Sequence, residues 1–305
     1  ISLLFDSLLR SHERAPPSCA PMRYYTNGLH AMRCGMCGCK TVYQFDDEED
    51  PQDDRLQRCA ACGGKDAFIG AVHRFAMRLD DRIALVAGAL SSDPGNAAAS
   101  AAELGIAPDR SYADWREMAR AEAARPDGIE AVAIVTPNHL HAPQATAFLE
   151  AGIDVICDKP LATSVAEAEA LAALARARGR RLLVTLNNTG YAMVRQAREM
   201  VAAGAIGEIR AIHASYLQDW LSRPIDAEGH KQAEWRTDPA RAGQSAVLAD
   251  IGVHALSLAS FVSGRGVEAV AADLFTAVPG RRLDDNAHVL LRWQGGPRGT
   301  IVASQ

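Results

Sequence analysis

The stretch Ala131-Val-Ala-Ile-Val-Thr-Pro-Asn-His-Leu-His141 decides the fold class of this chain. Its first five residues are apolar without interruption and are either small or β-branched, which is typical of a strand buried on both faces of a parallel sheet. Apolar residues at helical spacing follow over 140–151, and Gly152 ends that helix. A buried strand, a polar turn and a helix in this order predict one unit of an α/β sheet.

The same alternation continues on both sides of this unit. Strands are predicted over 83–90, 154–157 and 181–186, and helices over 67–79, 112–124 and 164–178, with a further alanine-rich helix that ends at Gly105. Strands that alternate with helices of this length predict a Rossmann-like, doubly wound parallel sheet.

The pattern changes beyond residue 190. Helices are predicted over 193–203 and 250–262, and strands over 209–216, 267–278, 286–293 and 300–305. Because no helix separates the last strands, we expect a following α+β domain with a mainly antiparallel, open sheet that helices cover on one face.

Polar residues stand directly after two of the predicted parallel strands. Thr136-Pro-Asn138 follows one strand, and Asp158-Lys159-Pro160 follows another. Ligands of open α/β sheets bind beyond the carboxyl ends of the strands. Pro160 restricts the backbone of Lys159, so its ammonium could hold a substrate hydroxyl and a ribose together. The alternative is that Lys-Pro merely starts the next helix.

A third polar group is Asp250-Ile-Gly-Val-His254. Residues four apart on a helix share a face, so Asp250 and His254 are expected to point together. The carboxylate would orient the imidazole and raise its pKa toward neutrality, which suits proton transfer. The alternative is a helix cap beside a surface histidine.

The three groups in this order resemble the glucose–fructose oxidoreductase/inositol dehydrogenase (Gfo/Idh/MocA) family, from about Ala67 to the end of the chain. Members usually have Glu-Lys-Pro, so Asp158 is a departure. The resemblance implies a dinucleotide-binding domain, expected over 65–188. It also implies a substrate and oligomerisation domain, expected over 189–305 and truncated at its C-terminus.

The resemblance also implies roles for individual residues. Lys159 would hydrogen-bond the reacting hydroxyl, His254 would accept its proton as hydride leaves to nicotinamide C4, and Asp250 would orient His254 and the substrate. The further residues implied to bind cofactor are Gly63, Gly64, Phe68, Ile69, Ser91, Ser92, Thr136, Pro137, Asn138, His141 and Asp158. Those implied to bind substrate are Asn187, Asn188, Tyr191 and Arg236. The family's glycine-rich run before the aspartate is mostly replaced by 243–249, which puts the approach of that loop to the substrate in doubt.

The residue after the second strand bears on the choice of cofactor. An acidic residue there grips the ribose 2′-hydroxyl of NAD in dinucleotide-binding folds. Ser91 holds that place here, and a serine accommodates a 2′-phosphate without charge repulsion. We therefore expect NADP, with NAD as the alternative.

The sequence before residue 67 fits this family poorly. Only Gly63 and Gly64 remain of the glycine loop, and Asp66 would repel a pyrophosphate at the helix N-terminus. Arg55 and Arg58 are also unusual in a central buried strand.

Two C-x-x-C pairs occupy the same region. Cys34-Gly-Met-Cys37 and Cys59-Ala-Ala-Cys62 stand 21 residues apart and resemble a zinc ribbon, in which four thiolates hold Zn²⁺. We expect structural zinc at these cysteines, with 34–64 replacing or overlapping the first Rossmann strand and 1–33 a linker or disordered segment. The alternative is free thiols in a segment that does not fold.

Composition narrows the class of protein. A net charge of -5 and a pI near 6.0 argue against nucleic-acid and membrane partners, and no apolar run approaches the roughly 20 residues that span a bilayer. Six of the seven cysteines precede residue 63, which indicates a local metal site in a reducing, cytoplasmic compartment. The chain begins without Met and ends within a predicted strand, so we expect a fragment.

Two function hypotheses follow. The first is an NAD(P)-dependent oxidoreductase that transfers hydride between nicotinamide and a hydroxyl of a sugar or cyclic polyol, as a homodimer or homotetramer. The second is a catalytically weak binding or regulatory protein that carries a zinc ribbon on a degenerate dehydrogenase scaffold. A zinc-dependent alcohol dehydrogenase fits less well, because the cysteines lie together in the N-terminal segment.

Overall fold

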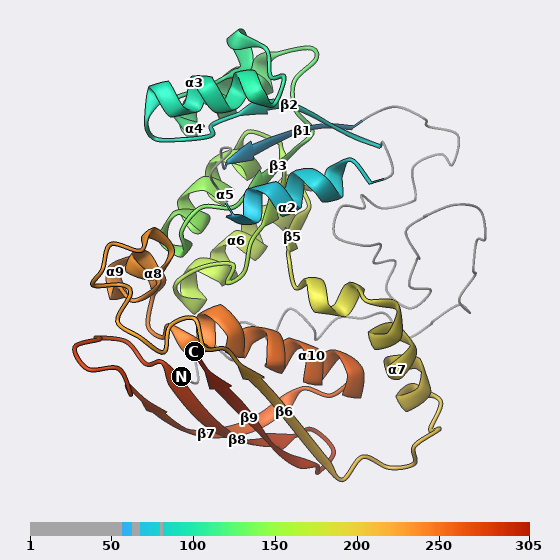
Figure 1. Cartoon of the computed structure of the whole chain (residues 1–305). Coiled ribbons are helices and arrows are strands. Elements are labelled where there is room, and N and C mark those ends of the chain that lie inside the picture. Colours follow the sequence, from blue (N-terminus) through green and yellow to red (C-terminus); the bar gives the residue numbers. More distant parts are fainter. Residues whose placement is uncertain (1–56, 63–67, 80–81) are drawn as a thin grey trace.

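The computed structural model of the chain describes residues 57–62, 68–79 and 82–305, and contains two sheets (Figure 1). The first is five-stranded with the order β2-β1-β3-β4-β5, and the second is four-stranded with the order β6-β9-β8-β7. The predicted combination of a parallel Rossmann-like sheet and a second, mostly antiparallel one is confirmed.

All neighbouring strands of the first sheet are parallel. These strands are β1 (Gln57–Cys62), β2 (Ile83–Gly88), β3 (Ala131–Ile134), β4 (Asp154–Cys157) and β5 (Leu182–Val184). All four residues of β3 are buried, as its uninterrupted apolar sequence predicts.

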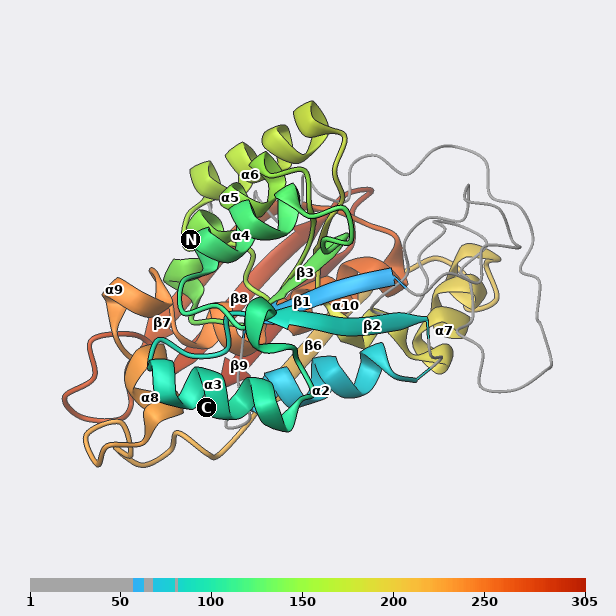
Figure 2. The same cartoon turned by 90° about the horizontal axis from the view of Figure 1, so that it is seen from above.

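Helices cover both faces of this sheet (Figure 2). One face packs against α2 (Phe68–Met77) and α3 (Pro94–Glu103). The other face packs against α4 (Trp115–Ala124), α5 (His141–Glu150) and α6 (Val165–Arg178). The chain steps outward from β1 to β2 and then back across β1 to β3, so the order of strands reverses between β1 and β3. A reversal of this kind opens a crevice at the carboxyl ends of the strands.

The first strand of the sheet is present as β1 and lies inside 34–64, the segment that was expected to replace or overlap it. Cys59, Ala60 and Ala61 are buried in β1 because their small side chains fit between the helices on both faces. Arg58 is accommodated at the start of the strand, where its guanidinium lies 2.8 Å from both Glu130 Oε1 and the Gly128 carbonyl. The first domain therefore begins before the expected boundary at residue 65.

The second sheet consists of β6 (Ala211–Leu217), β7 (Val267–Phe275), β8 (Asn286–Trp293) and β9 (Arg298–Ser304). β6 runs parallel to β9, and the other two pairs are antiparallel. Buried and exposed residues alternate along β8, and its buried residues pack on the face that α10 (Val253–Ser263) covers. Among the described residues, the opposite face of the sheet carries exposed side chains of β8, His288, Leu290 and Arg292.

The remaining elements lie within the two domains or, for η3 and α7, between the two sheets in the sequence. They are the 3₁₀ turns η1 (Pro108–Arg110), η2 (Asn138–Leu140) and η3 (Asn187–Gly190), the helices α7 (Ala192–Ala202), α8 (Lys231–Arg236) and α9 (Pro239–Ala242), and a π-helical turn η4 (Leu248–Gly252). Asn138 Nδ2 donates to the Ala242 carbonyl at 2.9 Å, which fixes α9 against the carboxyl end of β3. Within the described ranges, no helix has the length and apolar character needed to span a membrane.

Candidate active site

A cavity of about 1450 Å³ lies at the carboxyl ends of the first sheet and extends to the second domain. It is larger than the roughly 300–1,000 Å³ of a typical ligand pocket, so it has room for a dinucleotide and a second molecule. The residues expected from sequence that line it are Ile69, Ser91, Ser92, Thr136, Pro137, Asn138, His141, Asp158, Lys159, Asn187, Tyr191, Arg236, Asp250 and His254.

Gly63, Gly64, Cys34 and Cys37 lie outside the described residues, and so do the side chains of Cys62, which ends β1, and Phe68, which begins α2. Asn188 lies in η3 and does not line the cavity. The side chain of Cys59 packs in the core between β1 and α2. In the part of the chain that the structure describes, no three His, Cys, Asp or Glu side chains form a metal-binding group, so zinc is not supported.

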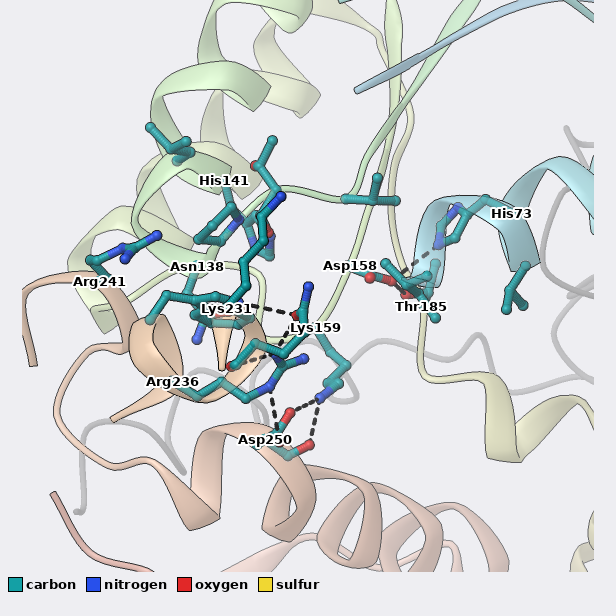
Figure 3. A pocket seen from close by; sticks show the side chains of 18 of the residues that line it. His73, Asn138, His141, Asp158, Lys159, Thr185, Lys231, Arg236, Arg241 and Asp250 are labelled. Carbon is teal, nitrogen blue, oxygen red and sulfur yellow. Dashed lines mark hydrogen bonds and ion pairs between the residues drawn. The ribbon is translucent and has the colours of Figure 1, made fainter. Parts of the chain in front are cut away.

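Asp250 is the centre of a charged group that joins the two domains (Figure 3). Lys159 Nζ lies 2.8 Å from Asp250 Oδ1 and 2.5 Å from the Asp250 carbonyl, and Arg236 Nε lies 3.2 Å from Asp250 Oδ2. Burial would raise the pKa of Asp250, but the charges of Lys159 and Arg236 outweigh it and hold that pKa below its usual value. Asp250 is therefore ionised at neutral pH.

His254 lies on the first turn of α10 and faces the same cavity, with its ring centroid 6.0 Å from that of Tyr216. Burial is the main reason that its pKa falls to about 4, and repulsion from Lys159 adds to the shift, while Asp250 and Asp158 oppose it. The imidazole is therefore neutral at pH 7.

This arrangement corrects the expected pairing of Asp250 with His254. Asp250 lies within the π-helical turn η4, whose wider spacing changes the rotation between residues 250 and 254. Both carboxylate oxygens of Asp250 bind the cations of Lys159 and Arg236 instead of the imidazole. The expected rise in the pKa of His254 is correspondingly wrong in direction.

His141 connects the loops that follow β3 and β4. Its Nδ1 lies 2.7 Å from the Pro160 carbonyl and its Nε2 lies 2.7 Å from the Thr136 carbonyl. The side chain is completely buried, and burial lowers its pKa against the opposing effect of the two carbonyls. His141 thus positions the residues on either side of it, and because it also lines the cavity, its expected place beside a nicotinamide ribose stays a prediction.

Asp158 is held by two residues that sequence reasoning missed. His73 Nε2 of α2 lies 3.2 Å from Asp158 Oδ1, and Thr185 Oγ1 donates to the same oxygen at 2.5 Å. Burial would raise the pKa of Asp158, but the contact with His73 and the Thr185 hydroxyl keep it low. Thr185 follows β5, so the rule that found Lys159, a polar residue at a strand's carboxyl end, could have found it as well.

Aromatic side chains form one wall of the cavity in the second domain. The Arg236 guanidinium lies 4.1 Å from the ring centroid of Trp235 and 5.7 Å from that of Trp220, and the rings of Trp220 and His230 are 5.9 Å apart. Aromatic faces opposite a few polar groups suit a ligand with one apolar and one hydroxylated face.

The far end of the cavity, beyond β2, is lined by Ser91, Ser92, Asn96 and Asp114. Ser91 Oγ accepts hydrogen bonds from the Asp93 amide at 3.1 Å and from Asn96 Nδ2 at 3.4 Å. Among the described residues that line this end, Asp114 supplies the charge, and it is negative.

The segment that replaces the glycine-rich run does not line the cavity. Ser245 through Ala249 are buried, and Ser245 Oγ donates to Asp284 Oδ2 at 2.6 Å. The doubt about the approach of this segment to a substrate therefore stands, and Lys159, Arg236 and His254 form that part of the wall.

Family models match most of the chain. The model described as an oxidoreductase family with an NAD-binding Rossmann fold (GFO_IDH_MocA) matches residues 58–186. The model described as the GFO/IDH/MocA C-terminal domain matches residues 194–305.

Among curated proteins, the uncharacterized oxidoreductase YfiI of Bacillus subtilis is 35% identical over 79% of this chain and 62% of its own length. Levoglucosan dehydrogenase of Pseudarthrobacter phenanthrenivorans is 34% identical over 69% of this chain and 51% of its own length. The chain thus spans about half to three-fifths of these relatives.

Among solved structures, an inositol dehydrogenase homolog from Azotobacter vinelandii in complex with NAD+ has a TM-score of 0.80 and 38% identity, and the match covers 82% of this chain and 65% of that one. The same homolog complexed with NADH and myo-inositol has a TM-score of 0.76, again at 38% identity, over 82% and 64% of the two chains.

Proposed function

The chain belongs to the Gfo/Idh/MocA family of oxidoreductases, and from this premise we propose that it is an NAD(P)-dependent dehydrogenase of sugar or cyclic polyol hydroxyls. The observation that carries the proposal is the Lys159–Asp250–Arg236 group beside the neutral imidazole of His254, in a cavity with room for two ligands. Its relatives include a homolog complexed with NADH and myo-inositol and a levoglucosan dehydrogenase.

The cavity fits a nicotinamide dinucleotide. It extends from Ser91 and Asn96, beyond β2, to Thr136 and Asn138, beyond β3, and so crosses the point where the strand order reverses. The described residues that would hold the cofactor are Ile69, Ser91, Ser92, Thr136, Pro137 and Asn138. When bound, the nicotinamide would supply the acceptor for a hydride.

Lys159 and His254 divide the work on the substrate hydroxyl. An ammonium has three donor hydrogens, and Lys159 uses two toward Asp250, so one remains for the hydroxyl oxygen. This donor stabilises the negative charge that develops on the oxygen as its proton leaves. His254, neutral at pH 7, accepts that proton. Asp250 and Arg236 fix the ammonium in place.

The alternative of a binding protein with a zinc ribbon has less support. A ribbon built from two C-x-x-C pairs needs the second pair outside the sheet, whereas residues 57–62 form the strand β1 between β2 and β3. A protein that only binds a partner would also not need the ion-paired group of Lys159, Asp250 and Arg236 in its cavity.

The family function is tested by incubating the chain with NAD+ and a panel of polyols and pyranoses that includes myo-inositol, levoglucosan and xylose. NADH fluorescence should rise with at least one of them. A folded sample that binds NADH but oxidises no member of the panel, neutral or charged, contradicts the proposal.

We expect NADH to bind more tightly than NADPH, by about tenfold or more, which is about 1.4 kcal/mol. The Asp114 carboxylate at the Ser91 end of the cavity repels a 2′-phosphate, and the solved relatives described above hold NAD+ or NADH. Parallel fluorescence titrations with NADH and NADPH measure the ratio.

The matched variant for this titration is Asp114→Asn. It should reduce the preference for NADH over NADPH, because NADPH should bind more tightly once the carboxylate is removed. Tighter binding of NADPH to the unaltered chain would instead support the argument from Ser91 that favours NADP.

We also propose that the open face of the second sheet binds a second copy of the chain. Leu217, Leu290 and Phe275 are 64%, 63% and 44% exposed on this face. These residues lie on β6, β8 and β7, so exposed apolar side chains are spread across the face, which favours an interaction surface. Arg292 and Asp273 lie on the same face, and a patch with both signs of charge can be self-complementary about a twofold axis.

Light scattering of the purified chain should give at least twice its mass of 32.6 kDa. Leu290→Arg should lower the measured mass toward that of a monomer, because it places like charges from the two copies opposite each other across the twofold axis. A monomeric unaltered chain at micromolar concentration would rule out this contact.

A further inference from the structure

The part of the cavity around Lys159 carries an excess of positive charge. Of the described residues that line it there, four are cations and three are carboxylates. The cations are Lys159, Lys231, Arg236 and Arg241, and the carboxylates are Asp158, Asp219 and Asp250, of which Asp158 is held by His73. Asp250 is shared by Lys159 and Arg236, so it cannot also neutralise the other two cations.

Lys231 and Arg241 are the unexplained members of this group. Lys231 begins α8 and Arg241 lies on α9, and both side chains line the cavity. Among the residues that the structure describes, none forms an ion pair or side-chain hydrogen bond with either one. Two arginines of the second domain do have such partners: Arg281 binds Asp226 and Asp285, and Arg282 binds Asp238.

We propose that Lys231 and Arg241 form a subsite for an anionic group on the substrate, a carboxylate or a phosphate. This inference rests on the proposed dehydrogenase function and narrows its substrate class to a sugar or cyclic polyol that carries a negative charge. A guanidinium offers a planar fork of donors to two anionic oxygens, and an ammonium adds a point charge.

The position of the two cations favours the substrate over the phosphates of the cofactor. A pyrophosphate binds at the N-terminus of the helix that follows the first strand, which is α2 here. Figure 3 shows Lys231, Arg236 and Arg241 on one side of the cavity and α2 with His73 on the other. Asp250 and Lys159 lie between them, so the two cations are on the far side of the proposed reacting centre from α2.

The side chains near Lys231 and Arg241 also suit a substrate ring that bears both hydroxyls and a charged group. Trp235 and Trp220 present aromatic faces to the cavity from the same domain as Lys231. An apolar ring face can pack on this wall while its hydroxyl reaches Lys159 and its anionic group reaches Lys231 and Arg241.

The test compares three probes of one ring type: glucose, glucuronate and glucose 6-phosphate. Binding of each to the NADH-loaded chain is measured by calorimetry, and kcat and KM are measured with NAD+. We expect at least one charged probe to bind about tenfold or more tightly than glucose, the difference expected from one charged hydrogen bond. The preferred probe distinguishes a carboxylate from a phosphate.

The variant Lys231→Met/Arg241→Met should lose this preference, mainly through KM and the binding constant. Its affinity for glucose and for NADH should change less than about threefold, because these ligands do not use the subsite. Arg178→Met, which removes an exposed arginine of α6, is the matched control and should keep the preference.

Three outcomes would overturn the inference. Equal binding of the neutral and charged probes would show that the cations do not select an anion. A charge preference that survives in the double variant would place its origin elsewhere. Weakened NADH binding in the double variant, with the preference intact, would assign the two cations to the cofactor. The binding measurement needs no turnover, so failure of the dehydrogenase proposal is seen separately.

Discussion

Alanine in place of His254 is expected to lower kcat at least about a hundredfold, because a positioned general base contributes about 10²–10⁴-fold. The imidazole is neutral at pH 7, faces the cavity and lies near Lys159, whose charge helps to lower its pKa to about 4. It can accept the substrate proton without first losing one of its own. Single-turnover formation of NADH, followed by fluorescence, measures the effect on the chemical step.

The same shift predicts the pH dependence of the reaction. His254 ceases to act as a base only when it is protonated, and burial lowers its pKa from the ordinary 6.5 of histidine to about 4. The acid limb of kcat/KM, which reports the free enzyme, should therefore lie well below pH 6.5. The limb should vanish in the alanine variant.

His288→Ala is the matched control, since His288 is exposed on β8 and stacks on Phe275 away from the cavity. It should keep the rate within about twofold, and both variants should bind NADH as the unaltered chain does. An unchanged kcat in the His254 variant would remove this histidine from the mechanism.

Methionine in place of Lys159 is expected to lower kcat by about 10²–10³-fold, the usual effect of removing one donor to a developing oxyanion. The side chain keeps its length, but its loss of charge also leaves Asp250 with Arg236 alone. The carboxylate stays paired, so we expect the variant to fold and to bind NADH. The pKa of His254 should rise at the same time, because Lys159 contributes to its depression.

Two measurements separate the role of Lys159 in the reaction from a structural one. The acid limb of kcat/KM should move to higher pH in Lys159→Met, which a merely loosened site would not produce. Asp250→Asn removes the negative charge beside Lys159 but retains the backbone carbonyl that the ammonium contacts. It should therefore lower kcat less than Lys159→Met does. A Lys159 variant with normal kcat and raised KM would show that Lys159 only binds the substrate.

Much of the fold was accessible from sequence because each element carries its own local signal. β4 was predicted with the bounds that the structure has, since the apolar residues Val155, Ile156 and Cys157 lie between the turn at Gly152 and the polar Asp158. α6 is defined by Ser164 and Glu167, which cap its start reciprocally, and by Gly179, which ends it with a φ of 61°.

The first strand escaped prediction because its residues satisfy two patterns at once. Cys59 belongs to a C-x-x-C pair, which suggests a metal ligand, yet a cysteine is also a small apolar residue that packs well in a sheet. Arg58 argued against a buried strand, but Glu130 and the Gly128 carbonyl, 72 and 70 residues away in sequence, receive its guanidinium. Such long-range partners leave no trace in the local sequence.

The site was predicted in its membership and not in its pairings. The positions of Lys159, Asp250 and His254 in one cavity follow from their motifs, but the π-helical turn η4 decides that Asp250 binds the cations. Lys231 and Arg241 were missed because an isolated cation on a short helix has no sequence signal; only the absence of a partner among the described residues distinguishes them.

The ion pair of Lys159 with Asp250 has a consequence for how the two domains move. Lys159 follows β4 of the first sheet and Asp250 precedes α10 on the second, so the pair bridges the cleft between them. A hinge motion would return both charges to water, and this rehydration offsets much of the attraction that is lost. If the cleft closed in another alignment, the Lys159 ammonium and the Asp250 carboxylate would be buried without water and without an ion-pair partner, which is unfavourable. We therefore expect the ion pair to permit any opening of the cleft for ligand exchange and to favour a single closed alignment.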